Sequence, residues 1–401
     1  MNLEVIAAPD SFKGSLSALQ AAEAIKRGIL KEVPEASVVM IPIADGGEGT
    51  VDAFLASVGG IRVPVRATGP LGGEVEAFYG ILSDGRTAVV EAAAACGLHL
   101  LNPSERNPFR ATTRGVGEIL LHAVSRGCRR IILGVGGSAT NDGGSGMLRA
   151  LGARFLDEDG REVPEGALGL ENLAVIDLSG WLWPSGGLEV VLAADVKNPL
   201  CGPNGASFVY GPQKFPPDAP PSEASLRALD GALERMARVS AEVLGRDMSG
   251  SEGAGAAGGL GFAAMAFLGA SVRSGAELVL EAARFDERLE QADLVFTGEG
   301  SIDRQTLFGK AVMRVCGAAA RRGVPVVALA GSVNAEEDVL RQLGLSAWAS
   351  IAVGPSSVDE MCSNAGVLLE RAAAGMMRWF NLGRFLAVKT HRGGVHQAGG
   401  C

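Results

Sequence analysis

The sequence predicts an α/β protein with two α/β domains, the second of them inserted into the first. Strand and helix signals alternate at both ends of the chain, whereas the middle opens with a run of short strands separated by turns. The 401 residues also exceed the ~250 residues that a single hydrophobic core normally serves. With 47% hydrophobic residues, the chain has enough apolar material for two buried sheets.

The first 60 residues predict a β-α-β-α succession. Residues 3–8 are a short apolar run, typical of a strand that is buried on both faces. Ser17 is a suitable cap for the helix that follows, in which apolar residues recur at helical spacing. Residues 38–43 predict a second strand and residues 51–58 a second helix, so the chain opens with a parallel sheet.

The pattern changes near residue 65, where we place a domain boundary. The strand-like runs 63–67, 75–82 and 87–90 follow one another, separated by the turn sequences GPLGG and SDG. Further strands at 130–135 and 189–194 alternate with helices, so the inserted domain is expected to be α/β with a mixed sheet.

The β-α alternation resumes towards the C-terminus, with strands expected at 293–297, 325–330 and 347–353. Together with the two N-terminal strands they give a five-stranded, flavodoxin- or Rossmann-like parallel sheet. The expected domains are therefore residues 1–65 plus 289–380 for the parallel-sheet domain and 66–288 for the inserted domain. Residues 381–401 are polar and glycine-rich, and we expect them to be disordered.

Composition excludes several classes of function. The net charge is −9 and no Lys/Arg block is present, so a nucleic-acid partner is not expected. No apolar stretch reaches the ~20 residues of a membrane span, and the N-terminus has no basic, apolar leader. We therefore expect a cytoplasmic protein without a membrane partner. The six cysteines and four histidines show no zinc-site spacing.

Two glycine-rich segments are candidate phosphate-binding loops. Residues 136–146 (GGSATNDGGSG) follow an expected strand and precede a helix, an arrangement that presents backbone N–H groups to an anion. The alternative is a purely structural turn. Residues 253–261 (GAGAAGGLG) contain a GxGxxG pattern, but no strand precedes it, so we interpret it as a phosphate loop and not as a dinucleotide fingerprint.

Acidic and basic side chains follow the other expected strands, at the edge of a parallel sheet where ligands bind. Glu299 and Asp303 follow the strand at 293–297 and suit Mg²⁺, although Asp303 could instead cap the next helix. Asp195 follows the strand at 189–194 and is a candidate general base or metal ligand. Asp10, Ser11 and Lys13 follow the expected strand at 3–8 in the same way, and Asp45 follows the strand at 38–43. Asn198 lies in the same loop as Asp195.

No histidine lies near these loops, so Ser/His or Cys/His nucleophilic catalysis has no obvious site. Anion-binding loops combined with Asp and Lys side chains favour phosphoryl transfer, which depends on positioning and charge stabilisation.

Six strings bear a resemblance to a known family: APDSFKGSLSA (8–18), PIADGGEGT (42–50), GVGGSATNDGG (134–144), NPLCGPNGA (198–206), GAGAAGGLG (253–261) and TGEGSIDRQT (297–306). In this order and spacing they resemble the bacterial glycerate kinases, over about residues 1–380. The resemblance implies transfer of the ATP γ-phosphoryl group to D-glycerate with Mg²⁺, usually giving 2-phosphoglycerate. It implies the small molecules D-glycerate and ATP as partners, and it leaves the oligomeric state open.

The resemblance also suggests roles for the loop residues. Asp195 is the preferred base, with Asp45 as its rival, and Lys13 assists catalysis. Asp10, Ser11, Lys13 and Asn198 are expected to bind the substrate, and Asp195, Glu299 and Asp303 to bind the metal. The expected contacts to the nucleotide phosphates are Gly136, Gly137, Ser138, Thr140, Asn141, Asp142, Gly143, Gly255, Gly258 and Gly259.

The alternative function is an NAD(P)-dependent dehydrogenase of a small hydroxy acid. GVGGSA (134–139) matches a GxGxxA pattern after a strand, with Asp157 or Asp159 downstream. Against it, the loop stays polar to Gly146 and no catalytic histidine is in place.

Overall fold

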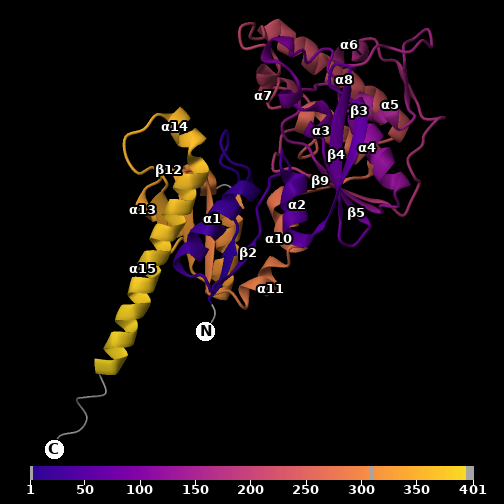
Figure 1. Cartoon of the computed structure of the whole chain (residues 1–401). Coiled ribbons are helices and arrows are strands. Elements are labelled where there is room, and N and C mark those ends of the chain that lie inside the picture. Colours follow the sequence, from indigo (N-terminus) through magenta and orange to yellow (C-terminus); the bar gives the residue numbers. More distant parts are fainter. Residues whose placement is uncertain (1–2, 308–310, 394–401) are drawn as a thin grey trace, which may run out of the picture. The chain divides into compact units, whose positions relative to one another are not determined.

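The computed structural model describes residues 3–307 and 311–393. The chain divides into two compact units, and each is considered by itself: unit 1 is Met1–Ile43 with Leu280–Cys401, and unit 2 is Ala44–Val279. Each unit has helices packed on its own sheet, which confirms the predicted α/β class (Figure 1). Across the described residues, no helix combines the length and the apolar character needed to cross a membrane.

Unit 1 contains a five-stranded sheet of order β13-β12-β11-β1-β2, in which every pair is parallel. The strands come from both ends of the chain, as the alternating pattern predicted. Their bounds are β1 (Glu4–Ala7), β2 (Ser37–Met40), β11 (Leu294–Ile302), β12 (Val326–Val333) and β13 (Ala347–Ser350).

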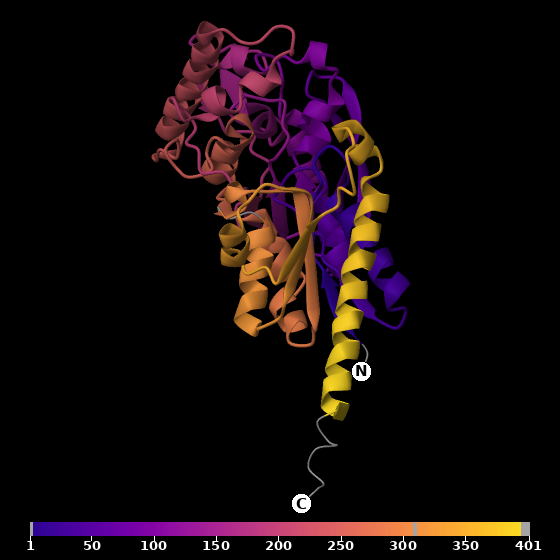
Figure 2. The ribbon, with the colours of Figure 1, turned by 90° about the vertical axis from the view of Figure 1, so that its left-hand side faces the viewer.

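Helices cover both faces of this sheet. On one face α1 (Ala18–Glu32) lies beside α15 (Ala365–Gly393), and α12 (Ala311–Arg322) lies on the other (Figure 2). Ser17 caps α1 through a capping box with Gln20, as expected of a serine at this position. The short helices of the unit are α11 (Phe285–Leu289), η5 (Arg304–Leu307), α13 (Glu337–Gln342) and α14 (Val358–Ser363).

Unit 2 contains a six-stranded mixed sheet of order β10-β9-β6-β5-β4-β3. Strands β10, β9, β6 and β5 are mutually parallel, and β4 is antiparallel to both β5 and β3. The bounds are β3 (Gly60–Thr68), β4 (Glu74–Leu82), β5 (Thr87–Glu91), β6 (Arg130–Gly134), β9 (Glu189–Ala193) and β10 (Ser271–Arg273). A separate antiparallel pair is formed by β7 (Arg154–Leu156) and β8 (Val175–Asp177).

The core of unit 2 is built largely from small and aliphatic side chains, and completely buried residues such as Leu133, Leu192 and Leu260 connect sheet and helices. Its helices are α2 (Thr50–Val58), α3 (Ala93–Cys96), α4 (Arg114–Ser125), α5 (Ser145–Ala150), α6 (Ala167–Leu170), α7 (Ala206–Val209), α8 (Glu223–Leu244) and α9 (Leu260–Leu268), and α10 (Gly275–Ala282) begins in unit 2 and ends in unit 1. Four 3₁₀ turns complete it: η1 (Leu98–Leu100), η2 (Pro103–Glu105), η3 (Pro212–Lys214) and η4 (Ala256–Gly259).

The structure differs from the sequence expectation at both domain boundaries. Residues 44–65 were expected in the parallel-sheet domain, but they belong to unit 2. The reason is that α2 packs on β4 and β5, and the Val51 N–H donates to the Glu91 carboxylate over 2.7 Å. Residues 280–288, expected in the inserted domain, belong to unit 1.

The C-terminal segment also differs from the expectation of disorder. Residues 381–393 continue α15, which begins at Ala365 and packs on α1. The rest of the expected tail, residues 394–401, lies outside the described residues.

Candidate active site

In unit 1, the loop that follows β1 lies against the neighbouring strand β11. The Asp10 N–H donates to the Gly298 carbonyl over 2.8 Å, and the Ser11 N–H donates to the Asp10 carboxylate over 2.6 Å. A bridge between Phe12 and Leu16 closes the loop and leaves Lys13 exposed. Asp10, Ser11 and Lys13 are therefore held together at the carboxyl end of β1, as predicted.

Glu299 and Asp303 lie close by, but their local structure differs from the predicted turn. Strand β11 continues through residues 298–302 because Ser301 and Ile302 pair with the extended end of β12. Glu299 is therefore a buried strand residue, and its carboxylate accepts a hydrogen bond of 2.8 Å from the Thr306 hydroxyl. The Asp303 N–H donates to the same hydroxyl, where η5 begins. Both carboxylates thus lie near the carboxyl end of β11, next to the loop of Asp10.

In unit 2, the loop 44–49 crosses the carboxyl ends of β6 and β9 through backbone contacts that only glycine permits. Gly46 has a φ of +91°, and a Cβ there would lie 2.1 Å from the Ala193 carbonyl oxygen. Its carbonyl accepts from the Gly136 N–H over 3.0 Å. A Cβ at Gly136 would lie 2.6 Å from the Cα of Gly47. Asp45 is thereby fixed beside the ends of both strands, with its own side chain exposed.

Asp195 and Asn198 follow β9 at the same edge of the sheet. Asp195 lies two residues after the end of the strand and is exposed. The Asn198 side chain donates to the Asn204 carbonyl over 2.8 Å and accepts from the Tyr210 hydroxyl over 2.6 Å. Asn198 thus holds its own loop in shape, while Asp195 and Asp45 share the carboxyl edge of the unit 2 sheet.

Most of the predicted phosphate loop 136–146 is buried. Gly136 and Gly137 are accessible, whereas residues 138–146 are not. The Asp142 carboxylate occupies the start of α5, where it accepts hydrogen bonds from the N–H groups of Gly144 and Gly146 and from the N–H and hydroxyl of Thr113. The donors expected to hold a phosphate at this helix are therefore already used by the protein, and Asp142 organises the loop from within.

The second glycine-rich segment packs directly on the first. The Gly143 N–H donates to the Gly258 carbonyl over 3.0 Å. Gly258 has a φ of +68°, and a Cβ there would lie 2.0 Å from the Thr140 carbonyl oxygen. The Gly255 N–H donates to the Asn198 carbonyl over 3.0 Å. The structure thus brings together the four loops that the sequence singled out in this unit, but much of their glycine serves contacts between backbones.

A buried polar cluster behind these loops was missed by the sequence analysis. Lys214 is 1% exposed, and its side-chain ammonium donates to the Thr140 carbonyl over 2.5 Å. Burial lowers the pKa of Lys214 to about 8, partly offset by Cys96 and Asp142 nearby. Asn141 donates to the Ser207 hydroxyl, while its Oδ1 is buried and accepts no hydrogen bond. No sequence pattern distinguishes a buried lysine such as Lys214 from a solvated one.

Glu91, the last residue of β5, is a second missed group. Burial raises the pKa of Glu91 to about 7, against hydrogen bonds from the N–H groups of Val51 and Gly49 that lower it. A signal was present in the sequence, since Glu91 follows an apolar run as the other candidate carboxylates do. Its side chain caps the start of α2 and so ties the loop 44–49 to the sheet.

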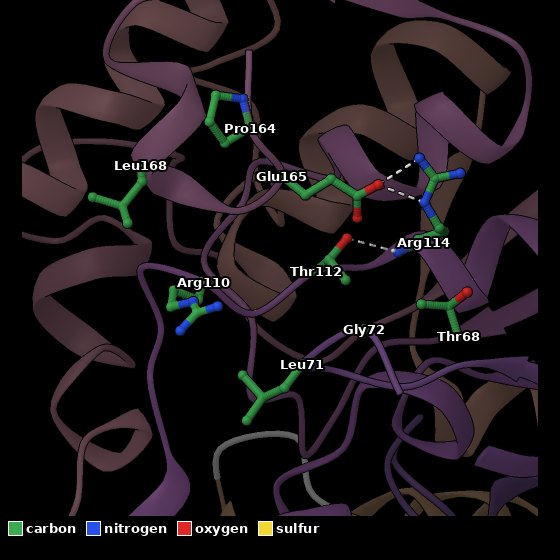
Figure 3. A pocket seen from close by; sticks show the side chains of 9 residues that line it. All are labelled: Thr68, Leu71, Gly72, Arg110, Thr112, Arg114, Pro164, Glu165 and Leu168. Carbon is green, nitrogen blue, oxygen red and sulfur yellow. Dashed lines mark hydrogen bonds and ion pairs between the residues drawn. The ribbon is translucent and has the colours of Figure 1, made fainter. Parts of the chain in front are cut away.

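Unit 2 also contains a pocket of about 480 Å³ that none of the predicted loops lines. Figure 3 shows the ion pair between Arg114 and Glu165 on one side of it and the Arg110 side chain on another. The lining residues are Thr68, Leu71, Gly72, Arg110, Thr112, Arg114, Pro164, Glu165 and Leu168.

The chemistry of the described residues narrows the possible functions. Within residues 3–307 and 311–393, no group of three or more His, Cys, Asp or Glu side chains forms a metal site. The dehydrogenase alternative is not supported either. A dinucleotide site needs its acidic residue at the end of a strand in the parallel sheet, but Asp157 and Asp159 follow β7, which lies with β8 in a separate two-stranded sheet.

Comparisons with known proteins agree with the six motifs. The sequence profile of the Glycerate kinase family matches residues 5–381. The glycerate kinase of Bacillus subtilis (strain 168) is 45% identical over 371 residues, covering 92% of this chain and 96% of that protein. The glycerate 2-kinase of Escherichia coli (strain K12) is 44% identical over 358 residues, covering 89% and 93%.

A solved structure extends the similarity to the fold. It is a crystal structure from Salmonella typhimurium LT2 of a protein assigned as glycerate kinase 2, with a TM-score of 0.84 and 42% identity. The match covers 96% of this chain and 100% of that one. The resemblance carried by the six motifs is thereby confirmed, and the chain belongs to the glycerate kinase family, a family of phosphotransferases.

Proposed function

We propose that the protein transfers the γ-phosphoryl group of ATP to a hydroxyl of D-glycerate with Mg²⁺, giving 2-phosphoglycerate and ADP. The observation that carries this proposal is the edge of the unit 2 sheet where the loop 44–49 is fixed over the ends of β6 and β9. There, two exposed aspartates, Asp45 and Asp195, share a sheet edge with the accessible glycines Gly136 and Gly137. Membership of the glycerate kinase family supplies the reaction class.

In this reaction, the attacking hydroxyl oxygen forms a bond to the γ-phosphorus while the bond from that phosphorus to the β–γ bridging oxygen breaks. The hydroxyl proton passes to a carboxylate, for which Asp195 is the preferred base and Asp45 the rival. Both are exposed at the same sheet edge, and each can accept a proton from a bound substrate. The breaking bond leaves ADP as the second product.

The nucleotide phosphates are assigned to the accessible part of the glycine loop. Gly136 and Gly137 present their backbone at the end of β6, whereas Ser138, Thr140, Asn141, Asp142 and Gly143 are buried. Their contribution, like that of Gly255, Gly258 and Gly259, is to hold the accessible glycines in place through the packing of the two loops. Most of the residues that were expected to contact the nucleotide phosphates directly are therefore proposed to act indirectly.

In unit 1, Lys13, Asp10 and Ser11 are proposed to bind anionic or hydroxyl groups of the substrates. Lys13 is exposed on a loop that a backbone bridge holds closed, so its ammonium is available to a carboxylate or a phosphate. Asn198 in unit 2 is proposed to act on the substrate indirectly, since its side chain is bonded to Asn204 and Tyr210.

Carboxylates of the chain fit the donor chemistry of Mg²⁺, which is bound through one or two carboxylates together with substrate phosphates and water. Asp195 is proposed as one ligand, and Glu299 and Asp303 as further candidates. When bound, the ion would neutralise charge on the β- and γ-phosphoryl oxygens. The lack of a three-residue metal cluster among the described residues is compatible with this kind of site.

The test is an assay of ADP release with D-glycerate, ATP and Mg²⁺, followed by phosphorus NMR of the product. Formation of 2-phosphoglycerate would support the proposal and its regiochemistry together. Turnover to 3-phosphoglycerate would retain the kinase and refute the position of transfer. A folded protein that binds ATP but does not phosphorylate D-glycerate would refute the acceptor.

Matched variants separate the two candidate bases. We expect Asp195→Asn to lower kcat by ~10² or more, as loss of a general base does, with the fold unchanged. Asp45→Asn tests the rival, and Asp177→Asn, at the end of β8 in the same unit, is the control. Near-normal kcat in Asp195→Asn together with a large loss in Asp45→Asn would transfer the role to Asp45.

A further inference from the structure

We propose that the pocket of unit 2 beside Arg110 and Arg114 is a binding site for a small organic phosphate. It lies among residues 68–72, 110–114 and 164–168, and none of the residues assigned above to the transfer reaction lines it. The proposal does not depend on the transfer reaction, because occupancy can be measured directly.

The walls of the pocket are tied together by the chain itself. The Thr112 N–H donates to the Pro70 carbonyl over 2.9 Å, and the Leu168 N–H donates to the Phe109 carbonyl over 3.1 Å. On the third side, the guanidinium of Arg149 donates to the Pro164 carbonyl over 3.3 Å. Because all three segments are fixed by hydrogen bonds, the pocket is preformed and binding requires little ordering of the protein.

Thr68, which also lines the pocket, is fixed by hydrogen bonds as well. The N–H and the hydroxyl of Thr68 both donate to the carboxylate of Glu118, over 2.7 and 2.8 Å. The hydroxyl remains able to accept a hydrogen bond from a ligand.

The charge of the lining selects an anion. Two guanidinium groups face one carboxylate, in a protein whose net charge is −9. Glu165 engages the Nε and one Nη of Arg114, which leaves the other Nη for a ligand. The Arg110 backbone N–H donates to the Asn107 carbonyl over 3.1 Å, but its guanidinium makes no hydrogen bond or ion pair with any residue in the described ranges. Two guanidinium groups offering free donors are the arrangement that favours phosphate, because arginine binds its oxygens in a bidentate manner.

The size and the apolar part of the lining select an organic ligand. A volume of about 480 Å³ is within the ~300–1,000 Å³ of small-molecule sites and exceeds what a phosphate ion alone would fill. Leu71 and Leu168 are 43% and 45% exposed, which leaves apolar surface for a ligand to cover. In Figure 3 the Arg110 side chain is drawn between these two leucines, so one molecule can contact charge and apolar surface together.

Hydrogen–deuterium exchange of the full chain tests this site without reference to turnover. The probes are ADP, 2-phosphoglycerate and inorganic phosphate, each titrated separately, and the readout is protection of the amides in residues 68–72 and 164–168. We expect one of the two organic phosphates to protect these segments at a concentration that inorganic phosphate cannot match. Protection by ADP would identify a nucleotide as the source of the phosphate, and protection by 2-phosphoglycerate a phosphorylated acid.

The decisive variant is Arg110→Glu, because Arg110 is exposed and its replacement should not disturb folding. We expect it to require at least about tenfold more ligand for the same protection, as the loss of a charge-assisted hydrogen bond implies. Arg126→Glu is the matched control, since Arg126 is an exposed arginine at the opposite end of α4 and should leave the titration unchanged. Equal protection in Arg110→Glu and wild type, no protection by either organic phosphate, or equal protection by inorganic phosphate would each overturn the proposal.

Discussion

Replacing Asp142 by asparagine should destabilise unit 2 although the two side chains have the same shape. Oδ2 of Asp142 accepts from Gly146 and from both donors of Thr113, and Oδ1 accepts from Gly144. Asparagine has one acceptor oxygen, so its best orientation serves the three donors and turns its NH₂ group towards the Gly144 N–H. That amide is then buried without an acceptor.

The magnitude follows from these four hydrogen bonds. A buried donor without a partner costs about 1–3 kcal/mol, and three bonds that change from charged to neutral acceptors lose ~1 kcal/mol each. Relief from burying a carboxylate opposes this loss, because burial raises the pKa of Asp142 and so disfavours its charged form. The net loss of stability should be ~2–4 kcal/mol. For a domain of 150–250 residues this lowers Tm by roughly 5–15 °C.

Calorimetry of the full chain at neutral pH measures this effect. Asp177→Asn is the control, because Asp177 at the end of β8 accepts hydrogen bonds from Ser179 and forms only a long, partly exposed ion pair of 3.8 Å with Arg154. Its Tm should therefore change by no more than about 2 °C. If Asp142→Asn melts within about 1 °C of the wild type, the carboxylate does not organise the loop and the reasoning is wrong.

Three further variants test other parts of the site. Gly46→Ala places a Cβ 2.1 Å from the Ala193 carbonyl oxygen and should lower both Tm and kcat/KM by displacing the loop 44–49. The control is Gly85→Ala, which also has a positive φ but open space around it, and it should change Tm only slightly. Equal effects of the two substitutions would contradict the packing argument. The pKa of Glu91 is raised to about 7 from ~4.3, so the stability that its protonated form contributes is lost as the pH rises through 7. Glutamine does not titrate, so the Tm of Glu91→Gln minus that of the wild type should increase between pH 5 and 8. A difference that stays constant over this range would refute the reasoning. Asp195→Asn should lose kcat with little change in Tm, as measured by ADP release and calorimetry, and a parallel fall in Tm would indicate a structural role instead.

The fold could be predicted where residue periodicity reflects burial. The strands at 63–67, 75–82 and 87–90 appear as β3, β4 and β5 within a few residues, since each run is apolar and bounded by turns. Periodicity does not show which sheet a helix packs on. The sequence shows that 51–58 is a helix, but not that it packs on strands that follow it in the chain. For the same reason β11 was expected to end at 297, because only its pairing with β12 carries it through the glycines to Ile302.

The glycine-rich loops show why the sequence could single out these loops but not predict what their glycines contact. The two glycine-rich loops, 136–146 and 253–261, were expected to bring their backbone close to a phosphate, and close approach of the backbone is indeed what they provide. At Gly46, Gly136 and Gly258, however, the nearby group is another backbone segment, at distances that exclude a Cβ. Composition cannot distinguish the two cases, since a backbone carbonyl and a phosphate oxygen demand the same absence of a side chain.

The sheet of unit 1 has a consequence for the order in which the protein folds during synthesis. Its central strand β11 pairs with β1 from Val5↔Leu294 onwards, so β1, α1 and β2 emerge from the ribosome long before their partner exists. Unit 2, which is contiguous from Ala44 to Val279, is complete by then and can fold first. Until β11 arrives, β1 exposes an unpaired edge, the kind of surface at which nascent chains associate wrongly. The parallel sheet can therefore form only after unit 2 and β11 have been synthesised, and α15, which follows all five strands in the chain, packs on α1 after them.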